Sequence, residues 1–193
     1  VPVMAEVVRT ALGAVGGPRV LLLGSAAEKP AARQLMRQLP AKMLPAVEDL
    51  SGKTDWPSLV EAVGGLDALV TPDTGIMHLG AHLGVPVLAF FLSSAWQHET
   101  GPYGEGHHVW QTSRGCGPCL ESGPCPYNVA CGEPLAQVEL LRSLVAVLAF
   151  SVWFRDFLLD PALLWATLSG AYKSECDSIE LTPGLTSLAN VTP

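Results

Sequence analysis

The residues best suited to binding chemistry lie in one short stretch, Asp73-Thr74-Gly75, with His78 following on the same side one helical turn later. The stretch follows an apolar run at 68–70 and precedes a short helical pattern. In open α/β sheets, ligands bind beyond the carboxyl ends of strands, where helices begin and free N–H groups favour an anion. Thr74 or Asp73 is predicted to cap the helix, and Gly75 allows close approach of a ligand. We therefore predict a phosphate-sized anion site here, although an ordinary helix cap with a structural histidine fits the same residues.

A second candidate site is a group of cysteines in the Gly/Pro-rich segment 113–134. Its four members have the spacing C-x2-C-x5-C-x5-C and are Cys116, Cys119, Cys125 and Cys131. Four thiolates on a turn-rich loop suit a tetrahedral metal site or an iron–sulfur cluster, and structural zinc is the favoured occupant. Reduced thiols without metal, or disulfides formed on handling, are the alternative.

Composition limits the classes of protein to consider. The 193-residue chain is 49% hydrophobic and 15% charged, which excludes a disordered chain, and its formal net charge is −7. An acidic chain without clustered Lys and Arg is a poor candidate for binding nucleic acid. The uncharged run 143–154 is shorter than the roughly 20 residues of a membrane-spanning helix, so we interpret it as a buried helix. The cysteine usage does not suit a secreted disulfide scaffold, and no signal peptide is visible, so we expect a cytoplasmic protein.

Helices and strands are predicted to alternate along the first two thirds of the chain. The pattern gives a helix at 4–14, a strand at 19–24, a helix at 30–39, a short strand at 47–50 and a helix at 56–63. A strand, a helix and a strand follow within 68–91, and another strand at 108–112. Such alternation predicts an α/β fold, a Rossmann-like parallel sheet with helices on both faces.

The chain is predicted to contain two regions. Residues 1–150 form the α/β domain, including the cysteine-rich loop 113–134, and a helix is expected at 135–149. Residues 151–193 are expected to form a helical extension and a polar tail.

Four segments in sequence carry a resemblance to a known family. They are Leu22–Glu28, Asp49–Thr54, Asp73–Val87 and Thr100–Gly104. In order and spacing they resemble family 9 glycosyltransferases, the lipopolysaccharide heptosyltransferases and their relatives, and the resemblance spans roughly residues 1–150.

The resemblance implies the C-terminal, nucleotide-sugar-binding half of a GT-B glycosyltransferase. It places the donor, ADP-heptose or a similar nucleotide-sugar, near one set of residues. The diphosphate and ribose would be surrounded by Asp73, Thr74, Gly75 and Ile76, and the nucleotide would be held by His78. The ribose or adenine would meet Glu28, and the base would lie near Thr54. The family's catalytic base belongs to an N-terminal domain, and a lysine that meets the diphosphate would precede Val1. We therefore expect this chain to bind the donor without being a competent transferase, with no cofactor needed for transfer.

The implied partners are the nucleotide-sugar, a lipopolysaccharide core or other glycan acceptor, and the N-terminal domain. Nucleic acid is not among them, whereas peripheral association with the inner face of the inner membrane is an option that the acceptor suggests. Two other functions remain open from the residues alone. One is a non-catalytic interaction module stabilised by a metal, and the other is a different Rossmann-type nucleotide-binding protein. The glycines at 13–17 precede a strand, which disfavours a dinucleotide-binding fingerprint.

Overall fold

The computed structural model describes residues 2–13, 18–112, 117, 119 and 125. The chain divides into two compact units, Val1–Val152 and Trp153–Pro193, and the second lies wholly outside the described residues. The predicted helix at 135–149 and the extension at 151–193 also lie outside them, so the two-region organisation stays a prediction. No helix among the described residues is both long and apolar enough to cross a bilayer.

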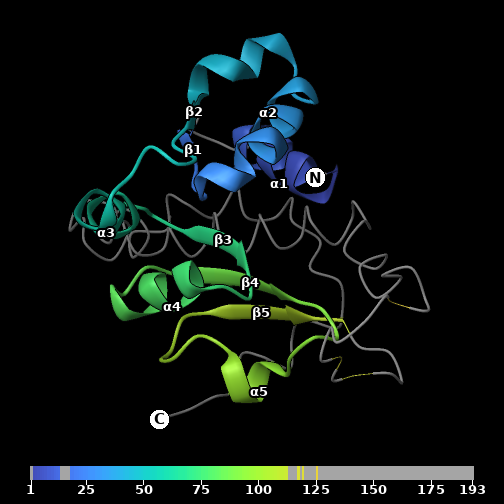
Figure 1. Cartoon of the computed structure of the whole chain (residues 1–193), viewed down its shortest axis with the longest axis vertical. Coiled ribbons are helices and arrows are strands. Elements are labelled where there is room, and N and C mark those ends of the chain that lie inside the picture. The colour runs from blue at the N-terminus through green and yellow to red at the C-terminus, as the bar shows by residue number, and fades with distance from the viewer. Residues whose placement is uncertain (1, 14–17, 113–116, 118, 120–124, 126–193) are drawn as a thin grey trace, which may run out of the picture. The chain divides into compact units, whose positions relative to one another are not determined.

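Helices and strands alternate along the described part of the first unit (Figure 1). In chain order the elements are α1 (Pro2–Gly13), β1 (Val20–Leu22), the 3-10 helix η1 (Ala26–Glu28), α2 (Lys29–Arg37), the 3-10 helix η2 (Ala41–Ala46), β2 (Val47–Asp49), α3 (Trp56–Gly64), β3 (Leu69–Pro72), α4 (Gly75–His82), β4 (Val87–Phe91), α5 (Gln97–Thr100) and β5 (His108–Gln111). The predicted α/β class is confirmed. The short helices η1, η2 and α5 were not predicted and lie between the predicted elements.

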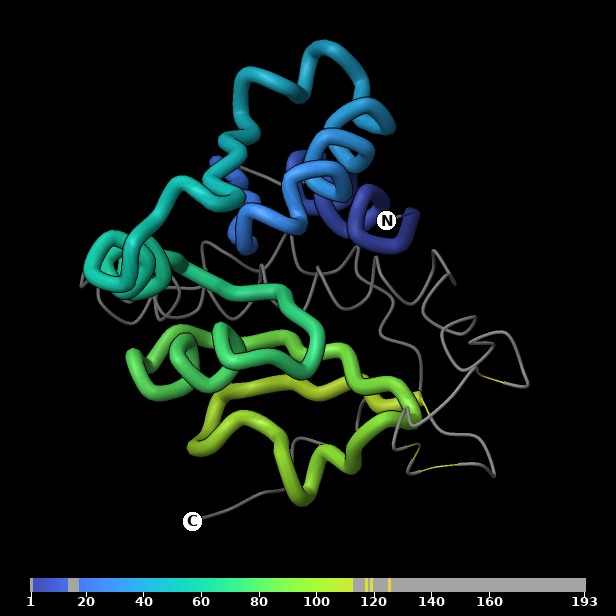
Figure 2. The backbone as a smooth tube through the Cα atoms, in the orientation of Figure 1, coloured from blue at the N-terminus to red at the C-terminus, as the bar shows by residue number. Residues whose placement is uncertain are grey.

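All strand pairs within the described residues are parallel, but these strands form two sheets rather than one. The first sheet has the order β1-β2, and the second has the order β3-β4-β5. Figure 2 follows the chain from β3 through a tight turn into α4 and back along β4. Because β3 and β4 run in the same direction, the turn after β3 lies at the carboxyl edge of the second sheet.

Strand β4 is the centre of the core, and all five of its residues are buried. Its side chains alternate between faces, as a strand requires. Leu88 and Phe90 join Val7 of α1 in one cluster, whereas Val87, Ala89 and Phe91 join Met77 of α4 in another. Helices therefore cover both faces of this sheet, as predicted.

Helix α1 also packs against the first sheet. Its residues Ala5 and Val8 share a cluster with Leu35 of α2 and Val47 of β2. The predicted strand at 19–24 is present as β1, but despite its apolar sequence each of its residues is only half-buried. Among the described strands, β1 pairs with β2 alone, so it lies at the edge of the described sheet.

Candidate functional site

The turn between β3 and α4 presents two free backbone donors. Helix α4 begins at Gly75, after Thr74 in an extended conformation at the N-cap position. The N–H of Met77 donates to the carbonyl oxygen of Thr74 at 3.0 Å. Within the described residues, the N–H groups of Gly75 and Ile76 have no hydrogen-bond partner. Unsatisfied N–H groups at a helix start carry partial positive charge and favour an anion.

The predicted side-chain cap of this helix is wrong. Thr74 makes no capping hydrogen bond, and its Oγ1 lies 3.1 Å from Oγ1 of Thr71 instead. The nearly buried Thr71 hydroxyl draws the Thr74 hydroxyl back toward β3, and this leaves the helix N–H groups uncovered. A ligand therefore meets these donors without competition from a cap.

Open space adjoins the start of α4 at Gly75. A Cβ atom built on Gly75 meets no heavy atom within 4 Å, and the residue is exposed. Gly80, further along the same helix, lies against the sheet, and a Cβ there would approach Leu69 Cδ2 at 2.6 Å. Close packing against this protein thus explains a glycine at position 80 but does not explain one at position 75.

His78 has a buried nitrogen without a partner. Its Nδ1 is inaccessible and makes no hydrogen bond, and its ring centroid lies 5.9 Å from that of Tyr103. Buried polar atoms in native proteins are almost always satisfied, so an orphan atom calls for an explanation such as an absent ligand or water. Ile76, in contrast, packs its side chain against the core cluster of Met77 and Val87. Only the backbone of Ile76 is therefore placed to meet a ligand.

A second segment reaches this turn from the end of α5. Thr100 Oγ1 donates to Oδ2 of Asp73 at 3.4 Å, and Tyr103, which is 77% exposed, lies beside His78. The carbonyl oxygen of Tyr103 is 3.0 Å from Nε2 of His107, and this contact restrains the loop. Residues 100–104 form one of the segments that resemble the family, but no role in the site was predicted for them. Their position identifies Thr100 and Tyr103 as additional site candidates.

Glu28 and Thr54 lie on two loops that contact each other. The N–H of Gly52 donates to the carbonyl oxygen of Gly24 at 2.7 Å, and this bond joins the loop after β2 to the loop after β1. Glu28 Oε2 accepts from the N–H of Ser25 at 2.7 Å, so one carboxylate oxygen is engaged locally. No hydrogen bond or ion pair among the described residues joins these loops to the Asp73 turn. The structure therefore brings the seven predicted donor residues into two groups.

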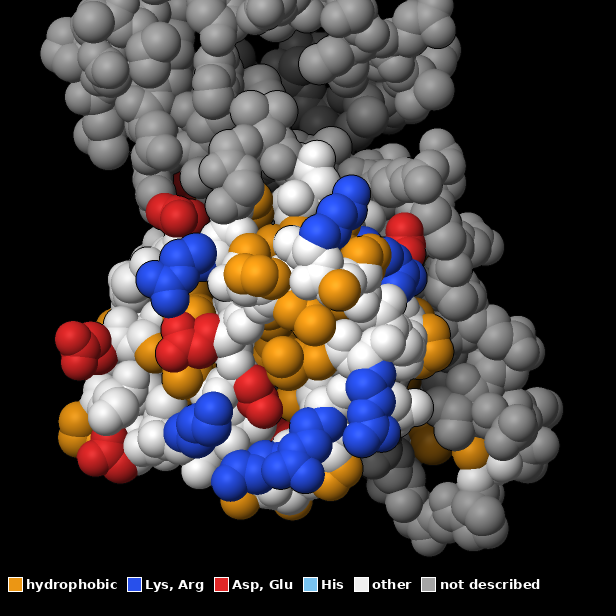
Figure 3. All heavy atoms as spheres, turned by 90° about the horizontal axis from the view of Figure 1, so that it is seen from above, with side chains coloured by type: hydrophobic (Ala, Val, Ile, Leu, Met, Phe, Trp, Pro, Cys, Tyr) orange, Lys and Arg blue, Asp and Glu red, His pale blue; other side chains and the backbone are white. Residues whose placement is uncertain are grey.

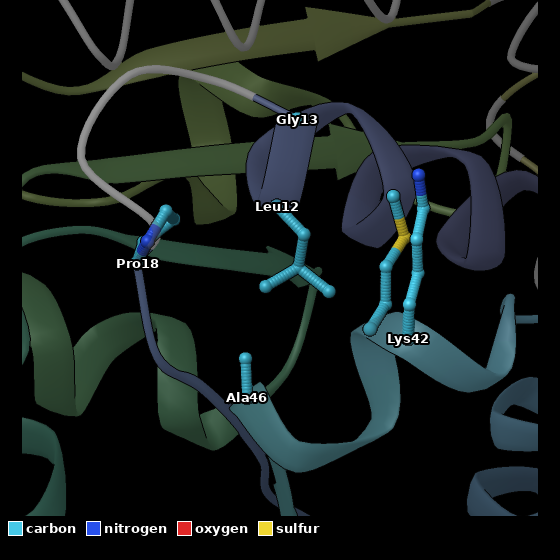
Figure 4. A pocket seen from close by; sticks show the side chains of 6 residues that line it. Leu12, Gly13, Pro18, Lys42 and Ala46 are labelled. Carbon is cyan, nitrogen blue, oxygen red and sulfur yellow. The ribbon is translucent and has the colours of Figure 1, made fainter.

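A pocket of about 280 Å³ lies elsewhere, between the end of α1 and η2. Leu12 points from α1 toward Ala46 of η2, and Lys42 and Pro18 flank the space (Figure 4). The pocket lies near the start of β1, whereas the Asp73 turn follows the end of β3. It is therefore separate from the candidate donor site.

The predicted metal site cannot be assembled from the described residues. Cys116 and Cys131 lie outside them, Cys119 is half-buried and Cys125 is exposed. No group of three or more potential metal ligands occurs in the described ranges. Structural zinc at the four cysteines stays a prediction.

Comparison with known proteins identifies the family. The sequence model for "Glycosyltransferase family 9 (heptosyltransferase)" matches residues 5–128. The chain belongs to glycosyltransferase family 9. This match covers β1 to β5 and includes the Asp73 turn, both loops with Glu28 and Thr54, and the segment 100–104.

Individual members of family 9 are similar over parts of this chain. "Lipooligosaccharide heptosyltransferase 2" of Haemophilus influenzae is 32% identical over 75 residues, which are 39% of this chain and 22% of that protein. The structure of E. coli ADP-heptose LPS heptosyltransferase II aligns with a TM-score of 0.54 and 24% identity, over 71% of this chain and 41% of the other. A family 9 structure from Veillonella parvula aligns at a TM-score of 0.49 and 24% identity, over 57% of this chain and 30% of the other.

The family match and the Haemophilus influenzae relative support a heptosyltransferase-type glycosyltransferase family, and the alignment with heptosyltransferase II supports its fold. They favour neither a metal-stabilised interaction module nor a dehydrogenase-like enzyme. The chain spans less than half the length of the relatives it matches. Its donor, acceptor and activity are therefore matters for a proposal.

Proposed function

We propose that the Asp73 turn binds the diphosphate of a nucleotide-sugar, ADP-heptose or a close analogue, as the donor-binding half of a glycosyltransferase. The observation that carries this proposal is the pair of unpartnered N–H groups on Gly75 and Ile76 beside open space. These donors and the helix dipole together form an anion site of the kind that binds phosphates. Family 9 membership supplies the class of donor.

Different groups around this turn suit different parts of the donor. A carboxylate only accepts hydrogen bonds, so Asp73 suits the hydroxyl groups of the ribose or sugar, and the N–H groups suit the phosphate oxygens. Because Nδ1 of His78 is buried, the nitrogen that can donate to the diphosphate is Nε2, and Tyr103 lies beside the ring. Glu28 and Thr54 are assigned to the ribose and the base on the strength of the family resemblance.

The rest of the reaction belongs to other parts of the proposed enzyme. An N-terminal domain would supply the base and bind the acceptor, a lipopolysaccharide core or similar glycan. The free N–H groups of α4 would stabilise the negative charge that grows on the departing diphosphate as the bond to the sugar breaks. The transfer in this proposal uses no cofactor, and the enzyme works in the cytoplasm at the inner face of the inner membrane.

Titration calorimetry with ADP and an ADP-sugar tests the donor site directly. The variant His78→Phe keeps a ring beside Tyr103 and removes the orphan nitrogen, so its melting temperature should not fall. Loss of a hydrogen bond to a charged group costs about 1.5–3 kcal/mol, so Kd for ADP should rise roughly 10- to 100-fold. The matched control is His82→Phe, at an exposed position later in the same helix.

Two results would contradict the proposal. One is the absence of measurable ADP binding by the folded chain at millimolar nucleotide. The other is equal ADP affinity of the wild-type chain and His78→Phe, which would make His78 a structural residue.

A further inference from the structure

The surface of α2 and η2 carries an unbalanced positive charge. Residues 29–47 contain four Lys or Arg side chains and no Asp or Glu, in a chain of formal net charge −7. Lys29, Arg33 and Arg37 follow each other at intervals of four residues, so they lie along one side of α2. The opposite side of the helix buries Ala32 and Leu35.

None of these four cations makes a hydrogen bond or ion pair with a described residue. Arg33, Arg37 and Lys42 are exposed, and Lys29 is half-buried. Arg33 helps to lower the pKa of Asp49 at a distance, but the hydrogen bonds from Ser51 are the larger cause. The positive charges of the surface are thus available to an external partner.

Acidic groups on the neighbouring elements already have partners. Arg9 pairs with Glu6 on α1, and Arg19 pairs with Glu48 on β2 at 3.0 Å. Glu28, just before α2, accepts from Ser25. Since these carboxylates are engaged elsewhere, they do not neutralise the stripe on α2.

Apolar side chains lie among the cations. Figure 3 views this side of the molecule and shows Lys and Arg side chains around a group of hydrophobic ones, with Asp and Glu side chains also on this face. The exposed apolar residues of the two elements and their junction are Pro30, Ala31, Pro40, Ala41 and Pro45. The apolar pocket between α1 and η2 opens beside Lys42, so one cation of the surface adjoins a small hydrophobic space (Figure 4).

We propose that this surface, defined by Lys29, Arg33, Arg37 and Lys42 with the apolar residues between them, docks on an anionic lipid bilayer. Cations at a membrane surface attract anionic headgroups, and neighbouring apolar groups enter the interfacial region. Single-stranded nucleic acid is a poorer fit because residues 29–47 contain no aromatic side chain on which a base could stack. This inference does not rest on the donor site, because the surface lies on α2 and η2 and not on the Asp73 turn.

Co-sedimentation of the full chain with lipid vesicles tests the proposal. One set of vesicles contains phosphatidylglycerol in phosphatidylcholine, and the other contains phosphatidylcholine alone. The chain should bind only the anionic vesicles, and the binding should fall as salt rises from 0.05 to about 0.5 M because the Debye length shortens. The double variant Arg33→Gln/Arg37→Gln should weaken partitioning roughly 25-fold, since each cation near the surface contributes a factor of about five.

The matched control is Arg19→Gln/Lys53→Gln, which changes the net charge equally at exposed positions outside the surface. It should retain most of the binding, and circular dichroism should show that both variants are folded. Equal binding to both kinds of vesicle, or an equal loss in the two double variants, would overturn the proposal. Binding to a single-stranded oligonucleotide but not to anionic vesicles would also overturn it and favour a nucleic-acid partner.

Discussion

Replacing Gly75 with alanine separates ligand binding from stability at the start of α4. No heavy atom lies within 4 Å of the new Cβ, so the substitution causes no clash within the described protein. Gly75 is the first residue of a helix, and Gly→Ala at a compatible position stabilises a protein by about 0.4–1 kcal/mol. For a chain of this size, that gain raises Tm by roughly 1–4 °C.

The same methyl group should weaken donor binding. In the proposed site, a phosphate oxygen accepts from the N–H groups of Gly75 and Ile76, and the phosphate occupies the open space beside Gly75. A Cβ there forces the phosphate away from at least one N–H. Loss of one such charged hydrogen bond, at about 1.5–3 kcal/mol, corresponds to a roughly 10- to 100-fold rise in Kd. Titration calorimetry with ADP and a thermal melt of the same sample measure the two effects together.

Gly80→Ala provides the opposite case on the same helix. Its Cβ would lie 2.6 Å from Leu69 Cδ2 and 3.4 Å from Val87 Cγ2, in a closely packed part of the core. Overpacking of this kind costs about 1–3 kcal/mol, so Tm should fall. If Gly75→Ala raises Tm and leaves the ADP affinity unchanged, the phosphate does not lie where we propose, and the reasoning fails.

Two further substitutions test the loops after the first two strands. Gly52 has φ of +59°, and a Cβ atom added there would lie 2.6 Å from the Cα of Ala26. Gly52→Ala should therefore separate the loops, lower Tm and weaken ADP binding. An unchanged Tm would contradict this packing. Hydrogen bonds from Ser51 hold the pKa of Asp49 below its ordinary value of 3.8, and nearby Lys53 contributes. Because the pKa of Asp49 is lower in the folded state, ionised Asp49 stabilises the fold at pH values above its unfolded-state pKa. This stabilisation is lost as pH falls below about 3.8. Asp49→Asn should therefore lower Tm at pH 7 more than at pH 3, and an equal loss at both would refute the assignment.

Periodicity and turn chemistry predict most of the local structure. The alternation of helical and strand patterns along residues 56–91 predicts parallel strands joined by helices, and the structure confirms them. The residues of the Asp73 turn were found in the sequence because a polar turn between a strand and a helix has a known place in α/β folds. These signals are local, so a few residues suffice to carry them.

The remaining features depend on contacts between distant residues. Nothing near Thr100 in the sequence indicates that its hydroxyl reaches Asp73, 27 residues away. The missing cap has the same cause, because the Thr74 hydroxyl could accept from an N–H of its own helix or turn to Thr71, and only the folded turn decides between them. The half-burial of β1 likewise depends on which elements lie beside it, and its own apolar sequence does not indicate them.

Helix α4 shows how the fold keeps a binding site both fixed and open. An eight-residue helix is too short to be stable in isolation, so its position must come from tertiary contacts. Met77 and Gly80 supply them, since both are buried against the sheet. At the N-terminal end the side chain of Ile76 also packs against the core, whereas the backbone N–H groups and the space beside Gly75 remain available. Because the anchoring residues and the binding residues alternate along one helix, core substitutions should disturb stability and donor affinity together, whereas changes at Gly75 or His78 can separate them.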